Sequence, residues 1–157
     1  MQKHVGMPQR PLPANHQRRK ALLIGINYVG CHAQLKGCVN DAWNVHCLLR
    51  HTLQFGEDQI RLLIDGENGQ PPKNARDPTR ANILAGLQWL TAGAQPGDCL
   101  VVLFSGYGAQ HPQAPGSDAH EAYLVPVDFA ADLPPDFFAA ASSGTPAPAA
   151  PSPGAPQ

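Results

Sequence analysis

The chain is poor in charge, and the charges it has nearly cancel. Charged residues make up 15% of its 157 residues, and the formal net charge is -1. The one basic cluster, Arg18-Arg19-Lys20, is too short to form the basic stripe of a nucleic-acid-binding protein, so we expect no nucleic-acid partner. No apolar run approaches the roughly 20 residues needed to cross a bilayer, and the N-terminal residues lack the apolar core of a secretory signal. We therefore expect no membrane partner and a cytoplasmic location.

Cysteine is also scarce, and no two cysteines form a Cys-x-x-Cys pair. The four cysteines are Cys31, Cys38, Cys47 and Cys99. This scattered placement is typical of reduced thiols rather than of a disulfide framework. A zinc site could draw on the first three together with His32 and His46, but their spacing matches no standard zinc template.

Short apolar runs alternate with helical patterns along the middle of the chain. Such alternation predicts βαβ units and therefore an α/β fold, with a mostly parallel sheet flanked by helices on both faces. The candidate strands are 21–26, 59–64, 100–104 and 122–128. The first has the continuous apolar character of a central strand, and the third that of a strand buried on both faces.

Two helices are predicted between these strands. Asn40 or Asp41 can cap the first, and Gly56 stands where a helix C-terminus favours glycine. Thr79 is the expected cap of the second, whose apolar stripe contains Ile83, Leu87, Leu90 and Ala94. A nucleotide-binding α/β domain remains an alternative for this pattern. Its glycines, however, do not match the dinucleotide fingerprint, and the Lys-Ser/Thr pair of a P-loop is missing.

The third strand runs directly into Ser105-Gly106-Tyr107-Gly108. Two glycines around one residue allow a sharp turn that presents Tyr107 at the carboxyl end of a strand, where open α/β sheets carry their ligands. We therefore expect the functional site at this turn.

Several motifs in the same order resemble the metacaspases, a family of caspase-like cysteine endopeptidases. They are Lys20 to Tyr28, Leu35-Lys36-Gly37-Cys38-Val39-Asn40-Asp41-Ala42, Asp77-Pro78-Thr79-Arg80, and the apolar strand ending in Ser105-Gly106-Tyr107-Gly108. The resemblance covers residues 19–129 and implies a caspase-like large-subunit domain, incomplete because the small-subunit part is absent. Residues 1–18 then form a short proline-containing arm, and residues 130–157 form an Ala/Pro/Ser-rich tail expected to be disordered.

The resemblance implies a pocket for an Arg or Lys side chain of a peptide or protein substrate. In the family the pocket is lined at the positions of Cys38 and Asp41, and Ser105 belongs to its wall. The same residues also have a structural interpretation: a helix cap, a small buried thiol and a turn serine.

Tyr107 stands where the family has its general-base histidine. A phenol has a pKa of about 10 against about 6.5 for imidazole, so only on the order of one tyrosine in a thousand is ionised near pH 7. His111 could in principle replace the base. The chain also contains no Asp-x-Cys-His-Ser-Gly pattern, in which the family places its nucleophile. We expect a catalytically inactive chain, whose partner could be an active metacaspase or a separate small subunit. The alternative is a non-catalytic regulatory module that docks on an active metacaspase.

The family uses an acidic residue after the tyrosine turn as a calcium ligand. The resemblance therefore implies Ca²⁺ as a possible cofactor, with Glu121 as its ligand. Here His120-Glu121-Ala122 replaces the family's Tyr-Asp-Glu, and a glutamate reaches differently from an aspartate. Asp118 and Asp128 are further candidate carboxylates, either for calcium or substrate or as capping residues.

Overall fold

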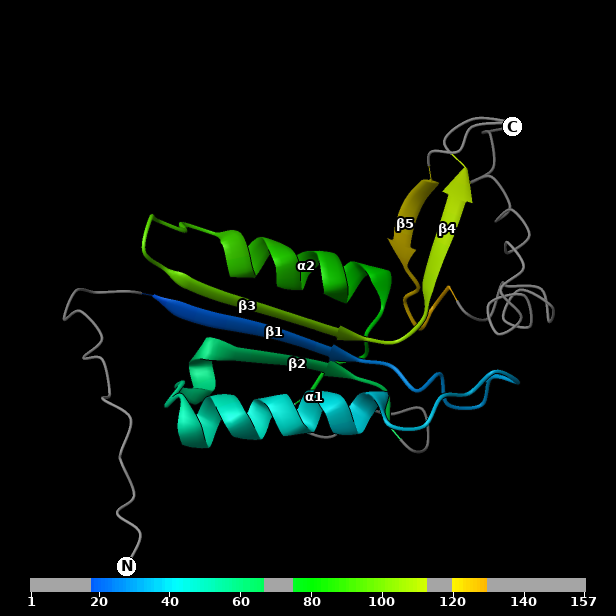
Figure 1. Ribbon diagram of the computed structural model, residues 1–157, viewed down its shortest axis with the longest axis horizontal. Helices are drawn as coiled ribbons and strands as arrows, with labels where there is room; N and C mark the ends of the chain where they lie inside the picture. Colours follow the sequence, from blue (N-terminus) through cyan, green and yellow to red (C-terminus); the bar gives the residue numbers. More distant parts are fainter. Residues whose placement is uncertain (1–17, 67–74, 113–119, 130–157) are drawn as a thin grey trace, which may run out of the picture.

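Three parallel strands form the centre of the fold (Figure 1). They are β1 (Arg19–Gly25), β2 (Ile60–Ile64) and β3 (Cys99–Ser105), arranged in the order β2-β1-β3. The computed structural model describes residues 18–66, 75–112 and 120–129, and at residues 110–112 and 120–121 it describes the backbone alone. The apolar run over residues 21–26 is thus confirmed as the central strand.

Side chains on β1 alternate between two apolar cores. Leu22 and Ile24 belong to the core beneath α2 (Arg80–Thr91), whereas Ala21 and Leu23 belong to the core beneath α1 (Cys38–Cys47). Because successive residues of a strand point to opposite faces, one helix covers each face of the sheet. Figure 1 shows the resulting three layers. This confirms the predicted α/β fold with helices on both faces.

The first helix begins and ends differently from the prediction. Its N-cap residue is Gly37, with a left-handed φ of 118°, so neither Asn40 nor Asp41 is the cap. The Asn27 side chain, from the end of β1, accepts a hydrogen bond from the Val39 amide at 3.3 Å. A distant residue therefore supplies an acceptor to the first turn, which is why the local pattern misled us.

A π-helical turn, η1 (Leu48–Thr52), continues α1, and a short 3₁₀ turn, η2 (Glu57–Gln59), leads into β2. The left-handed residue after this helix is Gln54, with φ 55°, and Gly56 has an extended φ of -66°. The predicted glycine C-cap at position 56 is therefore wrong. In the second helix Thr79 accepts a hydrogen bond from the Asn82 amide at 3.2 Å, as predicted for its cap.

A separate two-stranded sheet follows the tyrosine turn. It pairs β4 (Gly108–Pro112) with β5 (His120–Leu124) in an antiparallel hairpin. We predicted a strand over residues 122–128; β5 instead begins at His120 and ends at Leu124. The Val125 amide bonds to the Tyr107 carbonyl at 3.1 Å, which ties the hairpin to the end of β3.

The predicted burial of β3 on both faces is also wrong. β3 is the end strand of the described sheet, and Val102 at its centre is 52% exposed.

Candidate functional site

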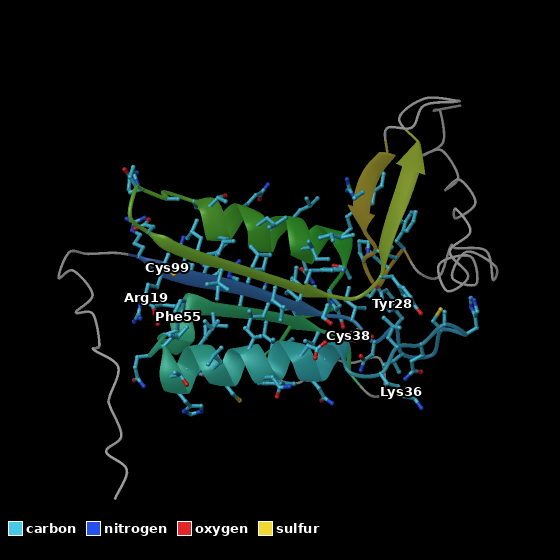
Figure 2. All side chains as sticks on the ribbon, viewed as in Figure 1. Arg19, Tyr28, Lys36, Cys38, Phe55 and Cys99 are labelled. Atoms are coloured by element: carbon cyan, nitrogen blue, oxygen red, sulfur yellow. The ribbon has the colours of Figure 1, made fainter. Side chains whose placement is uncertain are left out.

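The carboxyl ends of β1 and β3 meet the first turn of α1. The strand ladder extends past β1, because the Ile26 amide donates to the Ser105 carbonyl at 2.9 Å. In Figure 2 Tyr28 and Cys38 lie at this end of the sheet, and Arg19 and Cys99 lie at the other. The predicted location of the site, at the carboxyl edge of a parallel sheet, is thus where Cys38, Ser105 and Tyr107 come together.

Two of the predicted pocket residues are in direct contact. The Ser105 hydroxyl donates a hydrogen bond to Asp41 Oδ2 at 2.8 Å, across 64 residues of sequence. Asp41 lies in the first turn of α1, where the helix dipole favours a negative charge. One carboxylate oxygen is thus oriented by the serine, and the aspartate itself is exposed to solvent.

Gly25 explains why α1 approaches the end of β1 so closely. A Cβ atom at this position would overlap the Cys38 carbonyl oxygen and lie 2.9 Å from the Ala42 Cβ. The backbone of Cys38 therefore rests on the last residue of β1, and its thiol is half-buried and free. This close contact fixes the first turn of α1, including Asp41, against the sheet.

Tyr107 lies at the turn between β3 and β4, with its side chain directed to the loop that follows β1. Its hydroxyl donates a hydrogen bond to the Ala33 carbonyl at 2.8 Å. Burial raises the pKa of the Tyr107 phenol, and the Cys31 and Cys38 thiols raise it further. The phenol is therefore a weaker acid here than in water, and it holds its proton at neutral pH.

The glycine before Tyr107 is required for close packing rather than for an unusual φ. Neither Gly106 nor Gly108 is among the described glycines with positive φ. A Cβ on Gly106 would lie 2.9 Å from the Tyr28 hydroxyl and 3.1 Å from the Phe104 ring. The predicted sharp turn at Tyr107 is thus made possible by the small size of residue 106.

Tyr28 is the residue at this site that sequence reasoning missed. It is 1% exposed, and its backbone has a left-handed φ of 55°. Its hydroxyl donates to the Val125 carbonyl at 2.7 Å and accepts from the Tyr107 amide at 2.9 Å. The two tyrosine rings lie 5.0 Å apart. One buried phenol therefore holds the loop after β1, the turn at residue 107 and the segment after β5 together.

Asp65 is a second missed residue and supports the same loop. Its carboxylate is buried and accepts hydrogen bonds from the Asn27 amide at 2.8 Å and the Val29 amide at 3.1 Å. It lies directly after β2, and Tyr28 follows β1. The sequence did carry a signal for both missed residues, because a polar residue follows each of these strands. The carboxyl ends of parallel strands share one edge of the sheet, so such residues are expected to lie close together.

The predicted calcium ligands Glu121 and Asp118 lie outside the described side chains, so the calcium site stays a prediction. Glu121 lies on β5, where its backbone pairs with that of His111 on β4, but its side chain is not described, and Asp118 lies outside the described residues. Asp128 accepts a hydrogen bond from the Arg80 amide at 2.9 Å and so assists the start of α2. The described part of the chain contains no group of three or more acidic, histidine or cysteine side chains placed to hold a metal ion.

A hollow in the described part of the chain lies away from these residues. It has a volume of about 260 Å³ and is lined by side chains of α1, η2 and β2: Trp43, His46, Glu57, Ile60 and Leu62. None of the candidate residues contributes to it. Among the described helices, none is long and apolar enough to cross a membrane.

The sequence of this chain is similar to those of known proteins. A family model for the metacaspase, peptidase C14 domain matches residues 19–133. The chain is 43% identical over 114 residues to Metacaspase-1 of Saccharomyces cerevisiae. This match covers 71% of this chain and 26% of the relative. It is 42% identical over the same length to Metacaspase-1A of Neurospora crassa and 43% identical to Metacaspase-1 of Cryptococcus neoformans, each match covering 71% of this chain and 24% of the relative. The chain thus spans about a quarter of the length of these curated relatives.

Proposed function

The chain belongs to the metacaspase family, and from this we propose that it is a catalytically silent member that retains a pocket for Arg or Lys side chains. The hydrogen bond between Ser105 and Asp41 supports the pocket, because it holds a carboxylate at the carboxyl edge of the sheet. The protonated, hydrogen-bonded phenol of Tyr107 supports the lack of catalysis, and the proposal rests mainly on this observation.

Proton abstraction from a cysteine requires a group that has an available, unprotonated lone pair near neutral pH. Tyr107 instead carries its proton and directs it to the Ala33 carbonyl. Since the pKa of Tyr107 is raised above the ordinary value of 10.0, ionisation is rarer still than for a tyrosine in water. The phenol therefore acts as a tie between two loops rather than as a base.

A cationic side chain would be recognised by charge and by hydrogen bonding. Asp41 is exposed, and Ser105 occupies one of its oxygens, so the other is available to an ammonium or guanidinium group. Cys38 lies in the same turn of α1 and would border the aliphatic part of the bound side chain. Asp41 would supply the negative charge, whereas Ser105 only orients it. Loss of the Asp41 charge should therefore weaken binding of the cationic side chain more than loss of the Ser105 hydroxyl.

The silence can be tested in a chimaera. Residues 19–133 of this chain are joined to the part of the Saccharomyces cerevisiae relative that follows its matched region, and hydrolysis of a fluorogenic arginine peptide is measured. We expect no turnover with Tyr107 and activity at least about 100-fold higher in Tyr107→His, which restores an imidazole. Tyr123→His, at an exposed tyrosine of β5, is the matched control. Equal turnover by the unmodified chimaera and its Tyr107→His variant would show that the tyrosine does not silence the site.

The pocket is tested separately by binding. A blocked arginine peptide carrying a fluorophore is titrated with the 157-residue chain, and binding is followed by anisotropy. Asp41→Asn should weaken binding about tenfold, the value of one charge-assisted hydrogen bond at a partly exposed site. Asp58→Asn removes an exposed carboxylate on η2 and should leave binding unchanged. Unchanged binding by both variants would argue against the pocket, whatever the chimaera shows.

A further inference from the structure

The loop that follows β1 holds a thiol and an imidazole side by side. The Cys31 Sγ lies 3.7 Å from the His32 Nδ1, within hydrogen-bond range for sulfur. Cys31 is half-buried and forms no disulfide, whereas His32 is exposed to solvent. A neutral imidazole has one nitrogen without a proton, and this nitrogen can accept the proton of a neighbouring thiol. The pair therefore combines a nucleophile with a general base.

Backbone hydrogen bonds hold this thiol in place. The Cys31 amide donates to the Tyr28 carbonyl at 3.0 Å, and the Cys31 carbonyl accepts from the Gln34 amide at 3.1 Å. The Leu35 amide closes the loop by donating to the Asn27 carbonyl at 2.7 Å. The Cys31 side chain also packs against the core that contains Tyr28. The sulfur is thus presented in a defined position, which favours attack assisted by a neighbouring base.

Cys31 differs in this respect from Cys47 and Cys99. Both of these are more exposed than Cys31, and neither thiol forms a hydrogen bond with a histidine among the described residues. Exposure alone would make Cys47 and Cys99 react first with a reagent in solution. Assistance by the imidazole would make Cys31 react first, so the two explanations predict opposite orders of reaction.

We propose that Cys31 is a modification site at which the chain exchanges with a low-molecular-weight disulfide, and that His32 is the base for this reaction. The His32 Nδ1 takes the thiol proton while the Cys31 Sγ attacks one sulfur of the disulfide. A new S–S bond forms to Cys31, the S–S bond of the reagent breaks, and the departing sulfur receives the proton from the imidazolium. Cys31 is oxidised to a mixed disulfide, and the other half of the reagent leaves as a thiol.

The position of Cys31 gives this modification a structural consequence. Tyr107 packs against the same core as Cys31, and its hydroxyl bonds to the carbonyl of Ala33, two residues further along the loop. The Cys31 thiol also lies close enough to raise the pKa of that phenol. Because the sulfur is half-buried, a group attached to it needs space that the packed loop does not offer. We therefore expect the mixed disulfide to loosen the loop between Asn27 and Leu35.

The test follows each cysteine of the reduced 157-residue chain during incubation with hydroxyethyl disulfide, a small uncharged disulfide, at neutral pH. Tryptic cleavage after Lys36 separates Cys31 from Cys38, so mass spectrometry quantifies the modification at each. Cys31 should react at least about tenfold faster than Cys47 and Cys99, despite its lower exposure.

Two variants separate the base from the surroundings of the thiol. His32→Asn changes an exposed side chain and should slow the reaction of Cys31 at least about tenfold while leaving that of Cys47 unchanged. His51→Asn, which removes an exposed histidine of η1, is the matched control and should leave the rate at Cys31 unchanged. A faster reaction at Cys47 and Cys99 than at Cys31, or equal rates at Cys31 in the wild-type chain and His32→Asn, would overturn the modification site.

The effect on the loop is measured by amide hydrogen exchange on the chain modified at Cys31. The Gln34 and Leu35 amides should exchange faster than in the reduced chain, because both donate to carbonyls within this loop. The amides of α2 should not change. Unchanged exchange at Gln34 and Leu35 would overturn the loosening of the loop.

Discussion

Replacing Tyr28 with phenylalanine removes a single buried oxygen that joins three segments. That oxygen donates to the Val125 carbonyl at 2.7 Å and accepts from the Tyr107 amide at 2.9 Å. The ring and its packing against the Tyr107 ring remain, and the left-handed φ of residue 28 is as demanding for phenylalanine as for tyrosine. The substitution therefore isolates the hydrogen bonds from the packing.

The magnitude follows from the two groups that lose their partner. A buried donor or acceptor left without a partner costs about 1–3 kcal/mol. Val125 is fully buried, so its carbonyl carries the full penalty, whereas Tyr107 is only half-buried and water can reach part of its turn. We therefore expect Tyr28→Phe to lower the free energy of unfolding by about 2–3 kcal/mol.

The same substitution should change how stability depends on alkaline pH. Burial raises the pKa of Tyr28 above its ordinary value of 10.0, an effect that the hydrogen bond from Tyr107 only partly offsets. The folded chain thus holds this proton more tightly than the unfolded chain. Above pH 10 the unfolded chain loses the proton first, so the stability falls as the pH rises. In Tyr28→Phe this part of the alkaline loss is absent.

Urea unfolding followed by circular dichroism at pH 7 and at pH 10.5 measures both effects. Tyr123→Phe, at a tyrosine that is 49% exposed, is the control and should change the free energy of unfolding by less than about 0.5 kcal/mol. If Tyr28→Phe were as stable as this control at pH 7, the buried phenol would not hold the three segments together, and the reasoning would fail.

Two further substitutions test other parts of the fold. Gly25→Ala would press its Cβ into the Cys38 carbonyl, which belongs to the backbone and cannot move aside. We therefore expect the free energy of unfolding to fall by about 2–3 kcal/mol. A loss below about 0.5 kcal/mol would contradict the close packing of α1 on β1. Burial lowers the pKa of His46 below 6.5, so the free energy of unfolding should fall as the pH drops below 6.5. His46→Asn should flatten this pH dependence, measured by urea unfolding between pH 7 and pH 5. An unchanged pH dependence in the variant would refute the role of His46.

The elements of the fold were predictable because each depends on nearby residues. The apolar runs near residues 21–26, 59–64 and 100–104 became β1, β2 and β3, and the cap at Thr79 became the start of α2. Strand and helix patterns depend on side chains a few positions apart, which the sequence displays directly. Where a distant group intervened, as Asn27 does at the first turn of α1, the local prediction failed.

The candidate residues at positions 38, 41, 105 and 107 could be named because the motifs around them are recognisable in the sequence, even though Tyr107 replaces the family's histidine. What the motifs do not display is how these residues are bonded. The sequence shows a tyrosine in the place of the family's histidine, but only the fold shows that its hydroxyl donates a hydrogen bond to the Ala33 carbonyl.

The sequence by itself determined the α/β class, the central position of β1 and the family of this chain. The tertiary structure alone decided that Ser105 orients Asp41, that Tyr28 joins the loops around Tyr107 and that β3 lies at an edge of the described sheet. These contacts join residues 64 and 79 positions apart in the chain. Local patterns report the preferences of neighbouring side chains, whereas contacts over such separations exist only once the strands have found their order.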